Sequence, residues 1–333
     1  MKGQLPHCVC LPAARQLATL LALWCVVTHH AVATTQEPAG SEVPATNATF
    51  SADLSLGRET NHVPEVTWLD AEPYVLIGPN QRVTVPVWRT SVMGSVDMPL
   101  SGFQRVSVNW RLDQQRSGSG NLLGYRLMTA DARWGTAVAG IPTSVGPGVQ
   151  ELWVSGSRFR RTASLDADAT LQADPQGIWS VFASVGVYRH PGELRDLDAT
   201  AWSVSTLKRW TADLPGVDAL ELDMGMRGER NQQHIAGLSS RGVHVRSGVE
   251  YSVGDWSLSW GVTWQTTRYN GAVLDTGPSR RDAFVSWDAS ASLPLGAGWQ
   301  IRVSTTSASN RANLPMFFQK SRGWALSLGY TSP

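Results

Sequence analysis

Apolar and polar residues alternate along most of the chain with a period of two. This is the period of a β-strand whose two faces meet different surroundings. The pattern is clear over 217–228, where Leu220, Leu222, Met224 and Met226 alternate with charged residues and glycine. It repeats in each of the segments that follow, and helical spacing is hard to find. The sequence therefore predicts an all-β protein.

Segments of this kind lie near 49–57, 81–90, 104–112, 122–132, 149–158, 162–173, 178–189, 198–209, 217–228, 241–252, 256–268, 282–293, 299–308 and 322–331. They predict fourteen strands, with twelve as the alternative because the alternation is weak between 59 and 160. An even number suits a closed up-and-down barrel with both termini on one side.

The connections between these segments alternate in length. Short turns are expected at 173–177, 211–216, 253–255 and 294–298, and long polar loops at 189–197, 229–241, 269–281 and 309–321. Short periplasmic turns that alternate with long extracellular loops are typical of outer-membrane barrels. The chain is therefore predicted to be an antiparallel transmembrane β-barrel over residues 49–331 in the outer membrane.

Charged residues fill the polar face of the predicted strands and are too numerous for a dry core, so that face is predicted to line a wet lumen. The candidate lumen charges are Arg105, Arg111, Arg126, Asp166, Asp168, Glu221, Asp223, Arg227, Glu229, Arg246, Glu250, Asp288 and Arg302. We expect these acids and arginines to form a cross-strand ladder that sets pore shape and selectivity. Paired carboxylates that bind a cation or act in catalysis are the alternative for Asp166/Asp168 and Glu221/Asp223.

The N-terminal segment has the features of an export signal. A basic start, an apolar run from Leu17 to Val27 and the small-residue site Ala31-Val32-Ala33 predict a cleavable signal peptide over 1–33. All three cysteines fall inside it, so the mature chain is predicted to have neither disulfides nor thiolate metal sites. Residues 34–48 lack periodicity and are predicted to be a flexible periplasmic leader.

Composition adds two further expectations. The chain contains 15 tryptophans, several near the predicted strand ends, where aromatic girdles meet lipid headgroups. Its net charge is +1, which suggests no nucleic-acid partner. Loop arginines could clamp the phosphates of lipopolysaccharide, the expected lipid partner: Arg268, Arg280, Arg281, Arg311 and Arg322.

The C-terminal strand carries a pattern of Gly323, Leu326, Leu328 and Tyr330. It resembles the signal that outer-membrane proteins present to the barrel-assembly machinery, although the chain continues for three residues after the aromatic position. Residues 50–66 and 309–330 resemble the C-terminal barrel of surface lipoprotein assembly modifiers and related tetratricopeptide-linked proteins. The resemblance implies fourteen strands and a possible exported client protein. The family's helical-repeat domain is missing here, which puts a lipoprotein-export role in doubt.

No motif in the sequence indicates catalysis. Ser205-Thr206-Leu207-Lys208 matches an S-x-x-K motif, but on a strand the serine and the lysine point to opposite faces. His244 is expected to be a hydrogen-bonded wall residue rather than a base, and no metal spacing or phosphate-binding loop is present. We therefore expect no enzyme activity, no cofactor and no metal.

The leading functional hypothesis is a passive solute channel or a pore related to secretion. Two alternatives are a lipid-modifying hydrolase of the outer membrane and a structural or adhesive surface protein that acts through its long loops.

Overall fold

The computed structural model describes residues 48–68, 75–100, 104–117, 124–154, 156–174, 177–211, 216–272, 277–314 and 317–332. The predicted signal peptide and all but the last residue of the predicted leader lie outside the described residues. The strands belong to one compact unit, Thr46–Pro333.

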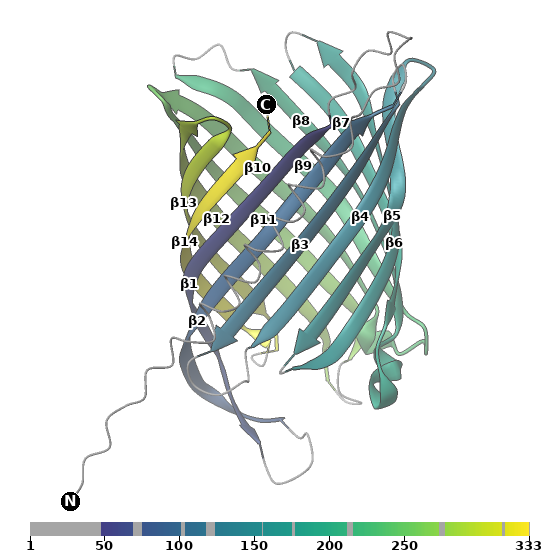
Figure 1. Cartoon of the computed structure of the whole chain (residues 1–333). Helices are drawn as coiled ribbons and strands as arrows, with labels where there is room; N and C mark the ends of the chain where they lie inside the picture. Colours follow the sequence, from purple (N-terminus) through teal and green to yellow (C-terminus); the bar gives the residue numbers. More distant parts are fainter. Residues whose placement is uncertain are drawn as a thin grey trace, which may run out of the picture. The chain divides into compact units, whose positions relative to one another are not determined.

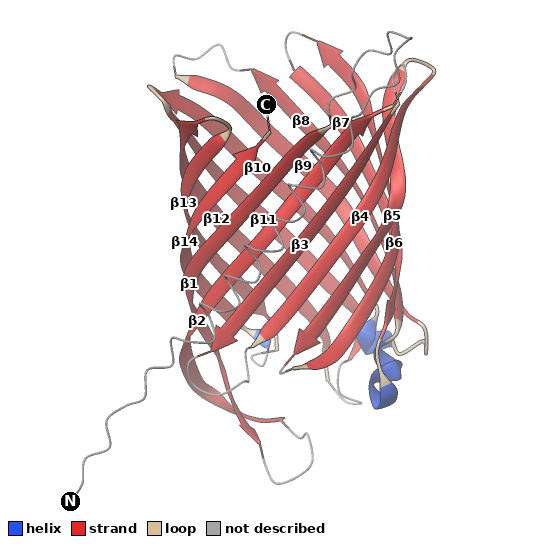
Figure 2. Ribbon diagram, viewed as in Figure 1, coloured by secondary structure: helices blue, strands red, loops and turns tan. Residues whose placement is uncertain are grey.

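The described chain is almost entirely β-sheet (Figure 2). The strands are β1 Thr49–Trp68, β2 Val75–Pro99, β3 Arg105–Ser117, β4 Tyr125–Val138, β5 Ile141–Val154, β6 Ser157–Asp174, β7 Gly177–Arg189, β8 Ala199–Thr211, β9 Val217–Asn231, β10 Ser240–Val253, β11 Trp256–Ala272, β12 Ser279–Gly296, β13 Trp299–Ala312 and β14 Gln319–Thr331. Two short 3-10 helices, η1 Gly192–Leu197 and η2 Ala236–Leu238, lie in connections.

Each strand pairs with its sequence neighbours, and β1 closes the sheet by pairing antiparallel with β14 (Figure 1). The closing register runs from Ser51 opposite Thr331 to His62 opposite Lys320. Where the first and last strands meet, the Ser332 N–H donates to the Phe50 carbonyl at 2.8 Å. We call this the terminal end of the barrel and the opposite end, which carries η1 and η2, the loop end. The prediction of a closed barrel of about fourteen strands is confirmed.

The outer face of the barrel is apolar. Register assigns one alternate set of residues on every strand to this face, and its large side chains are exposed: Leu56, Trp88, Trp110, Met128, Trp134, Val145, Val149, Leu165, Val185, Trp202, Val204, Met224, Met226, Val243, Val245, Trp260, Trp264, Val285, Trp287, Val303, Trp324, Leu326 and Leu328. Trp256 and Trp299 begin β11 and β13 at the terminal end, where an aromatic girdle is expected.

The lumenal face is polar, which reverses the distribution of a water-soluble protein. The buried polar side chains on it include Glu59, Asn61, Ser91, Asp113, Gln115, Ser144, Thr267, Asp282 and Ser327. A closed sheet with apolar residues outside satisfies every backbone group without water, which is what a lipid bilayer requires.

The weakly alternating region holds the largest departures from the predicted strand limits. The segment predicted at 149–158 is split between β5 and β6, and β5 begins at Ile141. Gly146, Pro147 and Gly148 interrupt the alternation there. The β4 ladder has a gap between the pairs Asp131 with Gly148 and Trp134 with Val145, so Pro147, which has no N–H, falls where β4 requires no hydrogen bond.

Candidate functional site in the barrel lumen

Register places nearly all of the predicted lumen charges on the lumenal face. The exception is Arg126, which lies opposite Gln114 and Trp153 and is exposed on the outer face. The sequence pattern does not show which alternate residues face outward at this point, because Leu127 and Met128 are adjacent and put one apolar residue on each face. The prediction of a lumenal Arg126 is therefore corrected.

Ion pairs join lumenal side chains across an intervening strand. Arg246 on β10 donates two hydrogen bonds to Asp288 on β12, at 2.8 and 3.1 Å, and so crosses β11. Its path lies over Gly261, where a Cβ atom would stand 2.7 Å from Arg246 Nη2. Glycine at this position therefore makes room for the pair.

A second bridge crosses β5. Arg133 on β4 donates to Asp168 on β6 at 3.0 Å, and the Ser144 hydroxyl on the strand between them donates to the same carboxylate. On β8, Arg209 contacts Glu250 at 2.5 Å and Glu221 at 3.7 Å. These bridges run around the circumference of the barrel and join side chains of different strands.

The strands near the closing seam carry a third set of pairs. Arg89 donates to Glu59 at 2.8 Å and to the Tyr125 hydroxyl at 3.2 Å, and Arg111 pairs with Asp113 at 2.6 Å. Glu59 and Asp113 are buried carboxylates, which need such partners.

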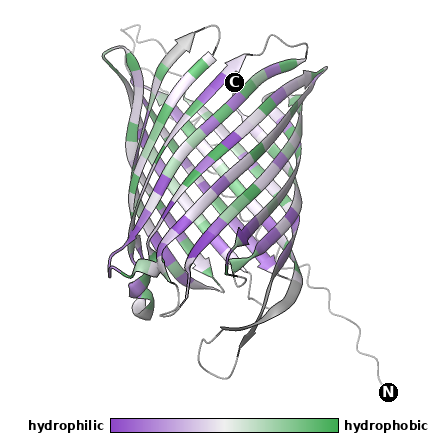
Figure 3. Ribbon diagram, turned by 180° about the vertical axis from the view of Figure 1, so that it is seen from behind, coloured by the Kyte–Doolittle hydropathy of each residue, from purple (hydrophilic) through white to green (hydrophobic). Residues whose placement is uncertain are grey.

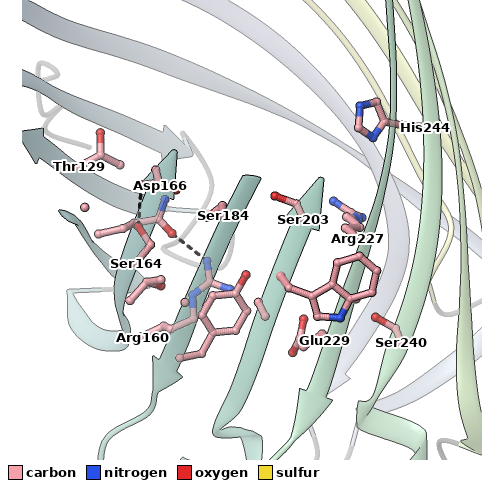
Figure 4. Close-up of a pocket in the computed structure, with 18 of the residues that line it drawn as sticks. Thr129, Arg160, Ser164, Asp166, Ser184, Ser203, Arg227, Glu229, Ser240 and His244 are labelled. Carbon is pink, nitrogen blue, oxygen red and sulfur yellow. Dashed lines mark hydrogen bonds between the residues drawn. The ribbon is translucent and has the colours of Figure 1, made fainter. Parts of the chain in front are cut away.

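A lumenal cavity of about 810 Å³ is lined by residues of β4 to β11, toward the loop end (Figure 4). Arg160 lines it, with its guanidinium 4.6 Å from the Tyr188 ring and 3.0 Å from the Gln150 side-chain oxygen. Arg227 and Glu229 face the same space from β9. No ion pair within 4 Å reaches either of them in the parts of the chain described above.

A Ser-His-Asp arrangement lies on the same wall. Ser205, Gly225 and His244 are in register on β8, β9 and β10, and His244 Nε2 lies 3.2 Å from Asp223 Oδ2. Gly225 lets the ring approach, since a Cβ there would be 2.5 Å from His244 Cε1. No hydrogen bond joins Ser205 to His244 among the described side chains, so this geometry does not activate the serine as a nucleophile.

Several lumenal residues were absent from the sequence prediction, including Glu59, Arg89, Asp131, Arg133 and Arg160. They lie on β1 to β6, in or next to the region where the alternation is weak. The sequence does place charges at every second position here, as at Asp131 and Arg133. The nearby glycines and prolines interrupt the alternation, so the pattern does not show which set of residues faces the lumen.

A buried asparagine joins two connections at the loop end, β7–β8 and β9–β10, which we call the rim. The Asn231 amide nitrogen donates to the carbonyls of Asp196 and Asp198, and its oxygen accepts from the backbone N–H groups of Gln233 and Ile235 at 3.0 and 3.1 Å. Only 1% of Asn231 is exposed. This one side chain therefore ties the β7–β8 connection to the β9–β10 connection.

The Asp198 carboxylate, in the same connection as the two carbonyls that Asn231 contacts, has several polar partners. It accepts hydrogen bonds from the His190 backbone at 2.7 Å and from Arg189 at 3.1 Å, and the His190 ring lies at 3.3 Å. Burial by itself would raise the pKa of Asp198, but these contacts outweigh burial and hold the pKa below its ordinary value. Burial lowers the pKa of His190, against the opposing effect of Asp198.

These two shifts predict that the rim loosens in acid. Both pKa values are lower in the folded state than in the unfolded state, so the folded rim binds fewer protons and its stability falls as the pH decreases. For His190 the loss is expected to begin near the ordinary histidine value of about 6.5. Hydrogen exchange of the 190–198 amides, corrected for intrinsic rate, should be constant from about pH 8 to 7 and accelerate below that value.

The control is His234→Asn, because His234 is an exposed histidine in the neighbouring connection. This variant should keep the acid response, whereas His190→Leu should remove its upper part. Protection that rises on acidification would contradict the assignment.

No group of three or more histidine, cysteine, aspartate or glutamate side chains in the described ranges could hold a metal ion. The helices in those ranges include none that is long and apolar enough to cross a membrane.

No protein-family model matches the chain, and a search of curated proteins finds no match. Among solved structures it is similar to OpdQ of Pseudomonas aeruginosa (10% identity, TM-score 0.42, 86% of this chain and 98% of that chain), to OprD of the same organism (9%, 0.41, 86% and 95%) and to OccAB3 of Acinetobacter baumannii (9%, 0.41, 85% and 98%).

Because the identities are so low and the TM-scores lie below 0.5, no property of those proteins is transferred to this chain. None of the three is a surface lipoprotein assembly modifier. The resemblance of residues 50–66 and 309–330 to that family therefore stays a prediction.

Proposed function

We propose that this protein is a passive channel for small polar solutes in an outer membrane. The observation that carries the proposal is the register around the closed barrel, which puts apolar side chains outside and charged side chains inside. An apolar exterior suits lipid, and a charged interior suits water and dissolved ions.

The size of the barrel supports the same proposal. Side chains fill the interior of barrels of about 8 strands, whereas barrels of 16–18 strands enclose an aqueous channel. This barrel lies between those limits and contains cavities of about 810 and 330 Å³ lined by lumenal residues. Spaces of that size fit small solutes rather than a folded protein.

Acids outnumber arginines among the described lumenal side chains, which favours cations over anions. The acids are Asp53, Glu59, Asp97, Asp113, Asp131, Asp166, Asp168, Glu221, Asp223, Glu229, Glu250, Asp282 and Asp288. The arginines are Arg89, Arg105, Arg111, Arg133, Arg160, Arg209, Arg227, Arg246, Arg280 and Arg302.

Conductance in planar bilayers tests the proposal. The refolded protein should conduct, with a reversal potential in a salt gradient that shows weak cation preference. Replacing Arg105, Arg227 and Arg302 by glutamine removes three lumenal cations that make no ion pair in the described part, and should increase that preference. A protein that conducts at no voltage, or a triple variant with unchanged selectivity, would contradict the proposal.

We also propose that the barrel-assembly machinery recognises β14. Leu326, Leu328 and Tyr330 face outward on β14, and Gly323 faces the lumen. Before closure these residues lie on an edge strand, and such edges pair readily with another strand. This supports recognition by the barrel-assembly machinery. The described residues provide no specific contact that favours secretion of a client protein, lipid hydrolysis or adhesion.

A further inference from the structure

Five exposed arginines form a row on the outer face of the barrel at the loop end. We call Arg230, Arg241, Arg268, Arg281 and Arg311 the arginine row. They lie on five consecutive strands, β9 to β13, and register gives them the same outward direction as the apolar side chains on those strands. In Figure 3, which shows the barrel from behind, hydrophilic positions gather at the loop end of the strands, drawn at the bottom.

The centre of the row brings like charges together. Arg268 lies directly opposite Arg241 on one side and directly opposite Arg281 on the other. Cross-strand like charges destabilise a sheet, so an anion between the guanidinium groups would stabilise this arrangement. None of the five arginines has an acidic partner within 4 Å in the described ranges.

Acids do not compensate the row from the neighbouring strand positions. The outward acid of the described strands at the loop end is Glu151 on β5. It pairs with Arg161 on β6 at 3.3 Å, and two strands, β7 and β8, separate this pair from the row.

The row lies beside the band of apolar side chains on the outer face of the barrel, which we call the apolar belt. Val243, Trp264 and Val285 face outward on the same strands, within two outward positions of the row toward the terminal end, and all are exposed. Farther toward the terminal end, outward positions on these strands are also apolar, as at Leu258, Ala291 and Ile301. The cations therefore stand at one edge of the belt, where the headgroups of one leaflet would lie.

We propose that the arginine row binds the phosphate groups of anionic lipid headgroups in the leaflet at the loop end. Arginine suits this ligand because its planar fork donates paired hydrogen bonds to phosphate oxygens. A headgroup with more than one phosphate relieves the repulsion between neighbouring arginines by bridging them. The inference rests on the membrane placement of the proposed function, and it is independent of whether the lumen conducts.

The test compares lipid binding by two matched triple variants of the refolded protein in neutral detergent. The first removes three outward cations, Arg241→Gln, Arg268→Gln and Arg281→Gln. The second removes three lumenal cations, Arg105→Gln, Arg227→Gln and Arg302→Gln. The probes are a diphosphorylated lipid A and phosphatidylcholine. Native mass spectrometry measures retained lipid, and heating measures the unfolding temperature.

The outward variant is expected to bind the diphosphorylated lipid roughly 100-fold more weakly than the original protein, and the lumenal variant to bind it unchanged. Phosphatidylcholine should not distinguish the three proteins. Without anionic lipid the outward variant should unfold at the same temperature or higher, because it has lost the repulsion. The diphosphorylated lipid should raise the unfolding temperature of the original protein and of the lumenal variant, but not that of the outward variant.

Equal binding of the diphosphorylated lipid by both variants would overturn the proposal. So would an outward variant that is less stable than the original protein in neutral detergent, since the arginines would then support the fold itself. Inorganic phosphate should fail to displace the lipid, and displacement at millimolar phosphate would identify a free anion as the ligand instead. If the outward variant does not refold, the Arg→Lys triple at the same positions replaces it and should bind with intermediate strength.

Because both triple variants are also measured in bilayers of neutral lipid, the two proposals fail separately. An original protein that conducts but does not bind the diphosphorylated lipid would contradict only the arginine-row proposal. An original protein that binds this lipid but does not conduct would contradict only the channel proposal.

Discussion

Val303→Arg is expected to destabilise the barrel in a lipid bilayer by about 2–4 kcal/mol, whereas Ser304→Arg, one residue later, should cost far less. Val303 is 51% exposed on the outer face of β13, opposite Leu326 and Ala291, near the middle of the apolar belt. Ser304 faces the lumen and lines a cavity of about 180 Å³. The two substitutions add the same side chain to the same strand, so their difference isolates the surroundings of each face.

Equilibrium unfolding of the protein in bilayers of defined composition measures both free energies. The same pair of variants in urea-compatible detergent micelles should differ less, because a micelle deforms around a charge more easily than a bilayer does. If Ser304→Arg were the more costly change, the assignment of the two faces would be reversed. The membrane placement would then be lost, together with both functional proposals.

Asn231→Ala is expected to lower the free energy of opening the rim at the loop end by about 2–4 kcal/mol. The substitution removes an amide that serves two carbonyls and two backbone N–H groups in a buried place. Those backbone groups would stay buried without partners or would admit water by opening the connections. Hydrogen exchange in 190–198 and 232–239 should therefore become roughly 30-fold or more faster.

The matched control is Asn313→Ala. Asn313 also joins a connection to a strand, because its oxygen accepts from the Arg281 N–H at 2.7 Å and its amide donates to the Ser279 carbonyl at 2.9 Å. These bonds are exposed, so water can replace the lost partner and a change of at most about 1 kcal/mol is expected. Similar losses in the two variants would show that burial is not what makes Asn231 important.

The strands with strong alternation could be read directly from the sequence. On β10, Val243 and Val245 alternate with His244 and Arg246, and the structure keeps this phase in both neighbouring pairings. A slip of one residue would put Arg246 into lipid, so the hydrophobic pattern itself specifies the register. The same logic gave the lumenal charges of β9 and β12.

Where two apolar residues are adjacent or glycine interrupts the strand, the sequence does not specify the register. Arg126 is one case, because Leu127 occupies a lumenal position that the pattern would assign to a polar residue. The start of β5 is another, because its proline becomes acceptable only when the gap in the β4 ladder is known. Both cases depend on how the strand pairs with its neighbours, which its own sequence does not contain.

The sequence by itself determined that this protein forms a closed antiparallel barrel with a charged interior, because a period of two and an even number of segments are properties of the chain alone. Only the tertiary structure decided which charges meet. Arg246 reaches Asp288, and the arginines of the row lie side by side, because residues tens of positions apart in the sequence are brought together when neighbouring strands pair in register. That spacing depends on the pairing of every strand with its neighbours, and no single segment contains it.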